Sequence, residues 1–228
     1  MRKVNIAIDG PNGVGKSTVS KNLAQRLNYT FINSGSVYRA ITLNALEQNI
    51  LTTDTAGVIK SLETINIELL PNDITLLDGN DISLKIRADY ISKVTPTVAK
   101  IPEVRAFVVK FIQHMTLRHK GYIIDGRDTT FRILPHAEVK IFLWATPEIR
   151  AQRRYEQNKI LGYNTNYQEV LKEVELRDQQ DIHREVDPLH KTEDAIYIDC
   201  TELTTEEVEN KIIDIVNQKL KAKKGQNA

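Results

Sequence analysis

The sequence lacks the features of secreted and membrane proteins. It has one cysteine, Cys200, so it cannot form an internal disulfide, and we expect a cytoplasmic protein in a reducing compartment. No apolar run approaches the roughly 20 residues of a membrane helix. The basic N-terminus is followed only by the short apolar run Val4–Ile8, so we expect no signal peptide and no membrane association.

An excess of charge of one sign is also missing. Lysine and arginine number 31 against 30 aspartates and glutamates, for a net charge of +1. This balance argues against a protein that grips a nucleic-acid polymer along its length. The five histidines show no metal-ligand spacing. The composition, with 41% hydrophobic and 27% charged residues, is typical of a globular protein.

Strand-like and helix-like segments alternate along the chain. A length of 228 residues suits one domain with a sizeable insert. We expect strands at Val4–Asp9, Tyr29–Ile32, Tyr122–Asp125, Val139–Leu143 and Ala195–Ile198. We expect helices at Ser17–Leu27, Ser36–Gln48, Pro102–Arg118, Pro147–Ile160, Tyr167–Asp181 and Thr204–Leu220. This order predicts an α/β fold with a parallel sheet covered on both faces, and a small β-rich insert over about Thr52–Pro96.

One motif identifies a phosphate-binding loop. Residues 10–17 fit G-x-x-x-x-G-K-[ST] in full, between a strand and a helix. Glycines let successive backbone N–H groups face one anion, and the helix N-terminus points at the same place. Lys16 adds a positive charge for the β- and γ-phosphates, and the Ser17 hydroxyl can ligate Mg²⁺. We predict that ATP or GTP binds with Mg²⁺ at Gly10, Pro11, Asn12, Gly13, Val14, Gly15, Lys16, Ser17 and Thr18.

Asp125 ends a hydrophobic strand, where an acid could hold Mg²⁺ through water. The alternative is a strand-end aspartate that caps a loop. The chain has no N-K-x-D motif, which a regulatory GTPase uses to read its base, and it is short for a motor or transport ATPase. These observations favour a small kinase.

Arginines near the ends of strands and helices suggest that the acceptor is anionic. A guanidinium holds phosphate in a bidentate fork, and the carboxyl ends of parallel strands share one edge of the sheet. Each arginine alone could be an ordinary surface residue. The candidates are Arg39, Arg105, Arg127, Arg177 and Arg184.

A pair of charged helices is a candidate lid. Arg150, Arg153 and Arg154 lie on the first of them, which leads into Gly162-Tyr163-Asn164. Closure of such a lid would exclude water and bring arginines to the transferring phosphoryl group. The alternative is a solvated helix with ordinary surface ion pairs.

Several segments together resemble the bacterial cytidylate kinases, the CMP/dCMP kinases among the nucleoside monophosphate kinases. The likeness runs from about Val4 to Val216. The segments that carry it are Ile8–Pro11, Ser34–Ala40, Val98–Arg105, Asp125–Asp128, Leu134–Leu143 and Arg177–Leu189. The resemblance implies a three-layer α/β/α P-loop kinase that transfers phosphate from ATP to CMP or dCMP. It implies a core at about 1–50, 97–146 and 190–220, an acceptor-binding insert at about 51–96 and a lid at about 147–189.

The resemblance also implies roles for individual residues. Arg39, Arg127 and Arg184 would hold the acceptor phosphate. Arg177 and Asp181 would contact the sugar, and Arg105 and Asp128 would read the cytosine edge. Ser34 and Tyr38 would shape the pocket. Lys16, Arg127, Arg150, Arg153 and Arg154 would stabilise the transferring phosphoryl group, and the protein would act as a monomer.

The sequence departs from that family at several positions near the expected base site. Asn33 stands where the family has aspartate, and Pro96 stands where it usually has serine. Thr129–Ile133 replaces I-G-T-V-V. A further departure is Asp187, which replaces the usual serine beside the lid hinge. Two alternatives therefore stay open: a kinase for a different or modified pyrimidine monophosphate, and a non-catalytic nucleotide-binding paralogue.

Overall fold

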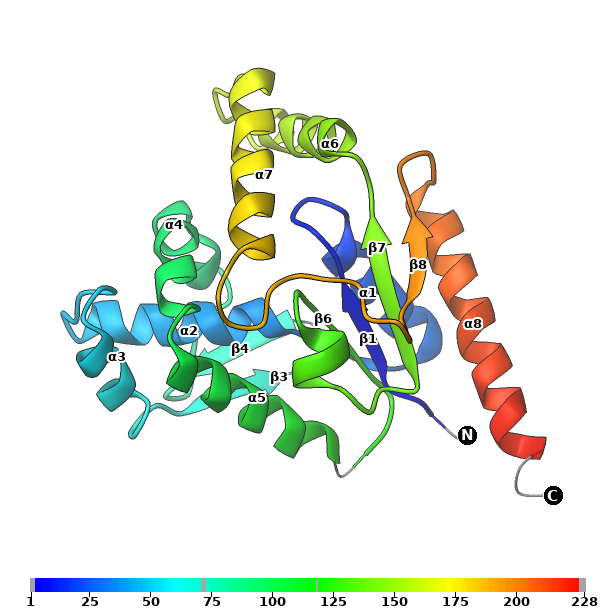
Figure 1. Ribbon diagram of the computed structural model, residues 1–228. Helices are drawn as coiled ribbons and strands as arrows, with labels where there is room; N and C mark the ends of the chain where they lie inside the picture. Colours follow the sequence, from blue (N-terminus) through cyan, green and yellow to red (C-terminus); the bar gives the residue numbers. More distant parts are fainter. Residues whose placement is uncertain (1–2, 71–72, 118, 226–228) are drawn as a thin grey trace. The chain divides into compact units, whose positions relative to one another are not determined.

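The computed structural model describes residues 3–70, 73–117 and 119–225 (Figure 1). The chain divides into two compact units, which are described separately. The first unit is Met1–Tyr29 with Lys120–Ala228, and the second is Thr30–His119. Among the described residues, no helix combines the length and the apolar character needed to cross a membrane.

A parallel sheet forms the centre of the first unit. Its consecutive strands are β6 (Tyr122–Gly126), β1 (Ile6–Asp9), β7 (Val139–Trp144) and β8 (Ile196–Asp199). Ile6 lies beside both Ile123 and Val139, and Asp9 lies beside Gly126 and Phe142, so β6, β1 and β7 end at the same edge. All four residues of β1 are buried, as expected for a strand covered on both faces. The predicted α/β fold with a parallel sheet is confirmed.

Two helices pack against this sheet. Helix α1 (Lys16–Leu27) contacts β1 and β6, and α8 (Thr205–Gly225) contacts β7 and α1. The buried Glu209 of α8 accepts hydrogen bonds from Asn22 (2.6 Å) and Arg26 (2.9 Å) of α1. These bonds satisfy a buried carboxylate and fix the two helices side by side.

Helices α6 (Pro147–Ile160) and α7 (Tyr167–Ile182) form a hairpin after β7 (Figure 1). Pro147 occupies the first turn of α6, and the preceding Thr146 accepts a hydrogen bond from the N–H of Ile149. Ala151, Val170 and Val174 are buried between the two helices. The hairpin has its own small core, and both helices begin at the predicted residues.

A second sheet and several helices make up the second unit. Its elements are β2 (Thr30–Asn33), α2 (Ser34–Glu47), α3 (Thr55–Ser61), the antiparallel strands β3 (Ile67–Leu70), β4 (Ile74–Leu77) and β5 (Asn80–Asp81), the 3₁₀ helix η2 (Lys85–Arg87), α4 (Asp89–Val98) and α5 (Pro102–Leu117). Helix α2 contacts α3, α4, α5 and β4. It is therefore the central element of this unit.

The prediction of a β-rich insert at Thr52–Pro96 was wrong in one respect, because α3, η2 and α4 lie in that stretch. Asp54 caps α3 by accepting a hydrogen bond from the N–H of Gly57 (3.0 Å). Helix α4 contains Pro96, which cannot donate a backbone hydrogen bond. In the same helix, Thr95 donates its side-chain hydroxyl to the carbonyl of Ile91 (2.7 Å). Sequence reasoning missed α3 and η2 because they are short, and it missed α4 because Pro96 argues locally against a helix.

Candidate active site

The loop between β1 and α1 adopts a conformation that needs glycine. A Cβ on Gly10 would lie 2.2 Å from the carbonyl oxygen of Leu143, so no side chain fits there. Gly13 and Gly15 have φ angles of 75° and 98°, in the left-handed region that disfavours other residues. Gly15 lies just before α1 and is its N-terminal flanking residue. The glycines of the motif thus shape the loop as its phosphate-binding role requires.

Lys16 is held inside this loop. Its ammonium group donates to the carbonyls of Gly10 (2.7 Å) and Pro11 (2.8 Å), and the residue is 7% exposed. Burial and the positive charge of Arg127 lower the pKa of Lys16 from 10.5 to about 7, against the opposing effect of nearby carboxylates such as Asp125. Because burial is the main cause of this lowering, an anion that enters the loop would stabilise the charged form of Lys16.

Ser17 and Asp125 meet at the start of α1. The Ser17 hydroxyl donates to Oδ2 of Asp125 at 2.6 Å, and Asp125 lies near the carboxyl end of β6. A hydroxyl and a carboxylate are the hard oxygen donors that Mg²⁺ prefers, so these residues fit the predicted ion. Within the described residues, no group of three or more His, Cys, Asp or Glu side chains could hold a metal.

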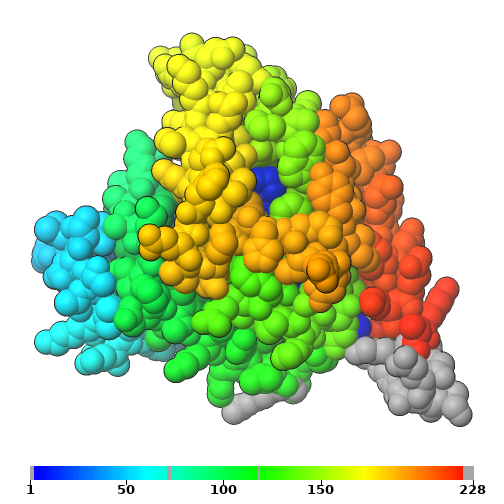
Figure 2. All heavy atoms as spheres, viewed as in Figure 1, coloured from blue at the N-terminus to red at the C-terminus, as the bar shows by residue number. Residues whose placement is uncertain are grey.

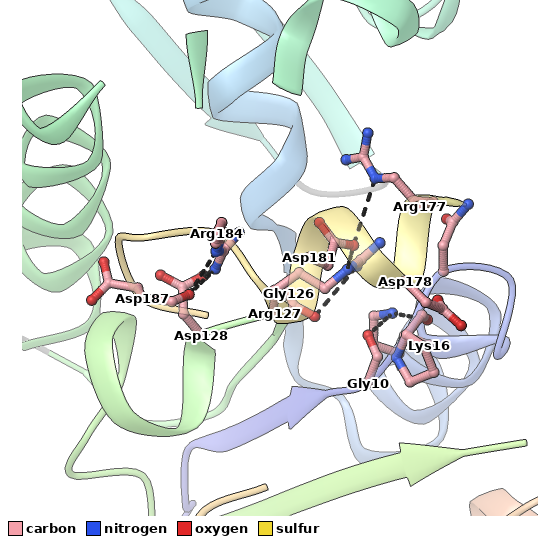
Figure 3. Close-up of polar contacts among 12 residues, drawn as sticks. Gly10, Lys16, Gly126, Arg127, Asp128, Arg177, Asp178, Asp181, Arg184 and Asp187 are labelled. Carbon is pink, nitrogen blue, oxygen red and sulfur yellow. Dashed lines mark hydrogen bonds and ion pairs between the residues drawn. The ribbon is translucent and has the colours of Figure 1, made fainter. Parts of the chain in front are cut away.

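Asp181 joins two of the predicted arginines (Figure 3). Its Oδ2 atom accepts from Nε of Arg127 at 2.7 Å and lies 3.5 Å from Nε of Arg177. Burial would raise the pKa of Asp181, but the arginines lower it below its ordinary value. Burial lowers the pKa of Arg177, and the charges of Arg127 and Arg154 add to this effect. Two predicted arginines therefore share one carboxylate, and Asp125 and Asp9 also raise the pKa of Arg127.

A second pair of opposite charges lies after β6. Arg184 contacts Asp128 (NH2 to Oδ1, 3.5 Å) and donates to the backbone carbonyl of Asp187 from Nε at 2.6 Å. Asp187 has a φ of 48°, and its carboxylate lies 3.7 Å from Nε of Arg132. Both Arg132 and Asp187 depart from the family pattern. The structure brings these two departures together as an ion pair.

Asp9 is a buried carboxylate to which the sequence reasoning assigned no role. It accepts hydrogen bonds from the N–H of Thr129 (2.8 Å) and from the N–H and hydroxyl of Thr130 (both 2.7 Å). These bonds hold the π-helix Thr129–Ile133, which was also not predicted. Asp9 thereby links the start of the phosphate loop to the residues that follow Asp128.

The three arginines of α6 differ in their surroundings. Arg150 is 1% exposed and donates to the carbonyl of Asn12 at 2.9 Å, and Arg153 donates to the carbonyl of Val14 at 3.4 Å. Both side chains therefore bind the backbone of the phosphate loop. Nε of Arg154 is buried and has no hydrogen-bond partner among the described residues. This atom can therefore donate to a ligand.

This part of the first unit is hollowed. Figure 2 shows a depression bordered by α7 in yellow, α6 in light green and the orange segment before α8, with blue N-terminal atoms at its floor. The depression gives a ligand access between the hairpin and the sheet.

Comparison with known proteins identifies the family. The family model for cytidylate kinase matches residues 6–218. Cytidylate kinase of Mycoplasmopsis synoviae is 58% identical over 94% of this chain and 98% of its own. Cytidylate kinase of Bacillus velezensis is 46% identical over 96% of this chain and 98% of its own. The chain belongs to the cytidylate kinase family.

Solved structures support the fold of this cytidylate kinase family member. A gluconokinase from Sinorhizobium meliloti has a TM-score of 0.51 at 13% identity, over 99% of this chain and 98% of its own. An uncharacterized protein from Eubacterium ventriosum has a TM-score of 0.53 at 12% identity, over 95% of this chain and 99% of its own. At such identities the likeness concerns the fold alone.

The remaining residues implied by the cytidylate kinase resemblance lie in the second unit. They are Ser34, Tyr38 and Arg39 on α2 and Arg105 on α5. Arg105 is 2% exposed, donates to the carbonyl of Ala99 at 3.2 Å and lies over the ring of Tyr38, 5.7 Å from its centroid. A Cβ on Gly35 would lie 3.1 Å from NH1 of Arg39, so the glycine leaves room for that guanidinium. Of these four residues, Arg105 and Tyr38 contact each other within the second unit.

Proposed function

We propose that this protein transfers the γ-phosphoryl group of ATP to CMP or dCMP, giving ADP and CDP or dCDP. The observation that carries the proposal is membership of the cytidylate kinase family over residues 6–218, together with an intact phosphate loop. The arginine cluster around Asp181, close to Lys16, supports an anionic acceptor. The protein works in the cytoplasm as a monomer, with small nucleotides as its partners and neither a membrane nor a nucleic-acid polymer.

The donor ATP binds at residues 10–18. Backbone N–H groups of the loop and the N-terminus of α1 hold its phosphates. Lys16 gives up its hydrogen bonds to the carbonyls of Gly10 and Pro11 and donates to phosphate oxygens. Ser17, with Asp125 acting through water, holds the accompanying Mg²⁺. When bound, Mg²⁺ neutralises charge on the β- and γ-phosphates and orients them.

The acceptor binds to the residues that the resemblance to the cytidylate kinases implies. Arg39, Arg127 and Arg184 hold its phosphate, while Arg177 and Asp181 contact its sugar. Arg105 and Asp128 read the base, since a carboxylate can select the amino group of cytosine over the carbonyl of uracil. Ser34 and Tyr38 shape the pocket. Residues of about 51–96 form the acceptor-binding insert, and residues of about 147–189 form the lid over the core.

The reaction needs no protein nucleophile. An oxygen of the acceptor phosphate forms a bond to the γ-phosphorus while the bond between that phosphorus and the β–γ bridging oxygen breaks. Lys16, Arg127 and Arg154 stabilise the charge on the transferring group, and the surrounding protein excludes water. Arg150 and Arg153 contribute through the loop carbonyls that they hold.

A second candidate is a kinase for a different or modified pyrimidine monophosphate. The departures at Asn33, Pro96 and Thr129–Arg132 favour it, because they lie at positions implied for base recognition. The hydroxyl of Thr130 and the ion pair of Arg132 fill that neighbourhood with new polar groups.

Steady-state assays with CMP, dCMP, UMP and AMP test both candidates. We expect CMP and dCMP to have the highest kcat/KM, and the Lys16→Ala variant to lose turnover with all four. Preference for UMP would favour the second candidate. Absence of turnover with every monophosphate would refute the nucleotide-kinase proposal and favour a non-catalytic binding protein.

A further inference from the structure

Arg150 makes more protein contacts than a side chain that reaches for a substrate would make. Its Nε donates to the carbonyl of Ala145 and NH1 to the carbonyl of Asn12, both at 2.9 Å. NH1 and NH2 together grip the carboxylate of Asp178 in a bidentate pair, with NH1 at 2.9 Å from Oδ1. The side chain is 2% exposed. All three guanidinium nitrogens are therefore engaged within the protein.

These partners belong to three different segments. Ala145 directly follows β7, Asn12 lies in the phosphate loop, and Asp178 lies on α7. A Cβ on Gly13 would lie 3.4 Å from Cβ of Arg150, so the start of α6 packs directly against the loop. One guanidinium thus connects the loop to the hairpin.

Asp178 lies beside Arg177 and Asp181, the two residues proposed to contact the acceptor sugar. It follows Arg177 directly and precedes Asp181 by three residues, so a single turn of α7 carries all three (Figure 3). A shift of α7 that breaks the Arg150–Asp178 pair would move Arg177 and Asp181 as well. A planar fork fixes both distance and orientation, which a lysine ammonium would not do.

We propose that Arg150 and Asp178 form a positioning pair, which holds the phosphate loop and the acceptor-side turn of α7 in one arrangement. This inference rests on the proposed function for the identity of the two nucleotides. Arg150 then acts through the loop backbone and through Asp178, and it does not touch the transferring phosphoryl group. The pair is required for the binding of both nucleotides, although Asp178 contacts neither.

Calorimetry on the Asp178→Asn variant tests the pair. The probes are the non-hydrolysable ATP analogue AMP-PNP with Mg²⁺, and CMP. Replacing one oxygen acceptor by an amide removes half of the fork and its charge, so we expect the affinity for each probe to fall at least fivefold. Asp178→Glu, which keeps the charge, should recover part of the loss. The matched control is Asp194→Asn, which breaks the exposed pair with Lys140 and should leave both affinities within twofold of the wild type.

The results separate a positioning role from a purely structural one. A folded Asp178→Asn protein with a lower melting temperature but unchanged affinities would overturn the inference, as would a loss confined to one probe. If that variant does not fold, Arg150→Lys, which keeps the charge and loses the fork, takes its place with the same expectation. A wild-type protein that binds AMP-PNP but not CMP would refute the proposed acceptor, while the AMP-PNP comparison would still test the loop side of the pair.

Discussion

The lowered pKa of Lys16 should make the stability of the protein depend on pH in a way that one substitution can isolate. In the folded protein the pKa is about 7, against 10.5 as the ordinary value. Between these values the unfolded chain binds more protons than the folded chain, so the free energy of unfolding rises as the pH rises. The cause is the cost of keeping an ammonium group buried beside Arg127.

The expected size follows from these two pKa values. One pKa unit corresponds to about 1.4 kcal/mol, so the stability contributed by this group should increase by about 3–4 kcal/mol between about pH 7 and about pH 10. Lys16→Met removes the ionisable group and keeps most of the apolar stem. The lost hydrogen bonds to Gly10 and Pro11 add a term that does not depend on pH. The wild-type protein should therefore gain stability relative to the variant across this range.

Urea unfolding of both proteins at several pH values measures this difference. Titration of all other groups cancels when the variant is subtracted from the wild type, provided that the m-values agree. Saturating ATP should flatten the dependence, because bound phosphates favour the charged lysine. A difference that stays constant between about pH 7 and about pH 10 without ligand would show that Lys16 keeps its ordinary pKa, and would refute the reasoning.

Three further substitutions test other parts of the structure. Asp181→Asn leaves Arg127 and Arg177 without their shared carboxylate. Urea unfolding should show that the free energy of unfolding falls by about 3 kcal/mol, and kinetics should show a raised KM for CMP. An unchanged KM would contradict the sugar-contact role. Asp9→Asn places an amide donor against the N–H donors of the π-helix. We expect the free energy of unfolding to fall by about 1–3 kcal/mol and kcat/KM for CMP to decrease. Unchanged kinetics would show that this carboxylate does not influence the acceptor site. Glu209→Ala removes the link between α1 and α8, and it should cost about 1–3 kcal/mol in urea while kcat stays at the wild-type value.

The sequence predicted those features that depend on local chemistry. The phosphate loop follows from eight consecutive residues, because its glycines, lysine and serine act on one ligand. The start of α6 follows from Pro147 with its capping Thr146. Strands buried on both faces, such as β1, read as apolar runs and were recognised for that reason.

Features that depend on distant partners could not be predicted in the same way. Arg150 and Asp178 are 28 residues apart, and nothing local distinguishes an arginine that binds a carboxylate from one that awaits a phosphate. Asp9 stabilises a π-helix 120 residues away, although the aspartate before Gly10 was part of a recognised motif. The short helix α4 was missed because Pro96 argues against a helix locally, and only packing against α2 overrides it.

The buried thiol of Cys200 lies against the phosphate loop. Its Sγ is 3.0 Å from the carbonyl of Trp144 and 3.7 Å from that of Val14, and burial raises its pKa. Since the chain has no other cysteine, a thiol reagent can label each molecule only here, and only while this region is open. The rate at which a thiol reagent labels Cys200 therefore measures how often the region around the loop opens. A nucleotide that orders the loop should lower this labelling rate.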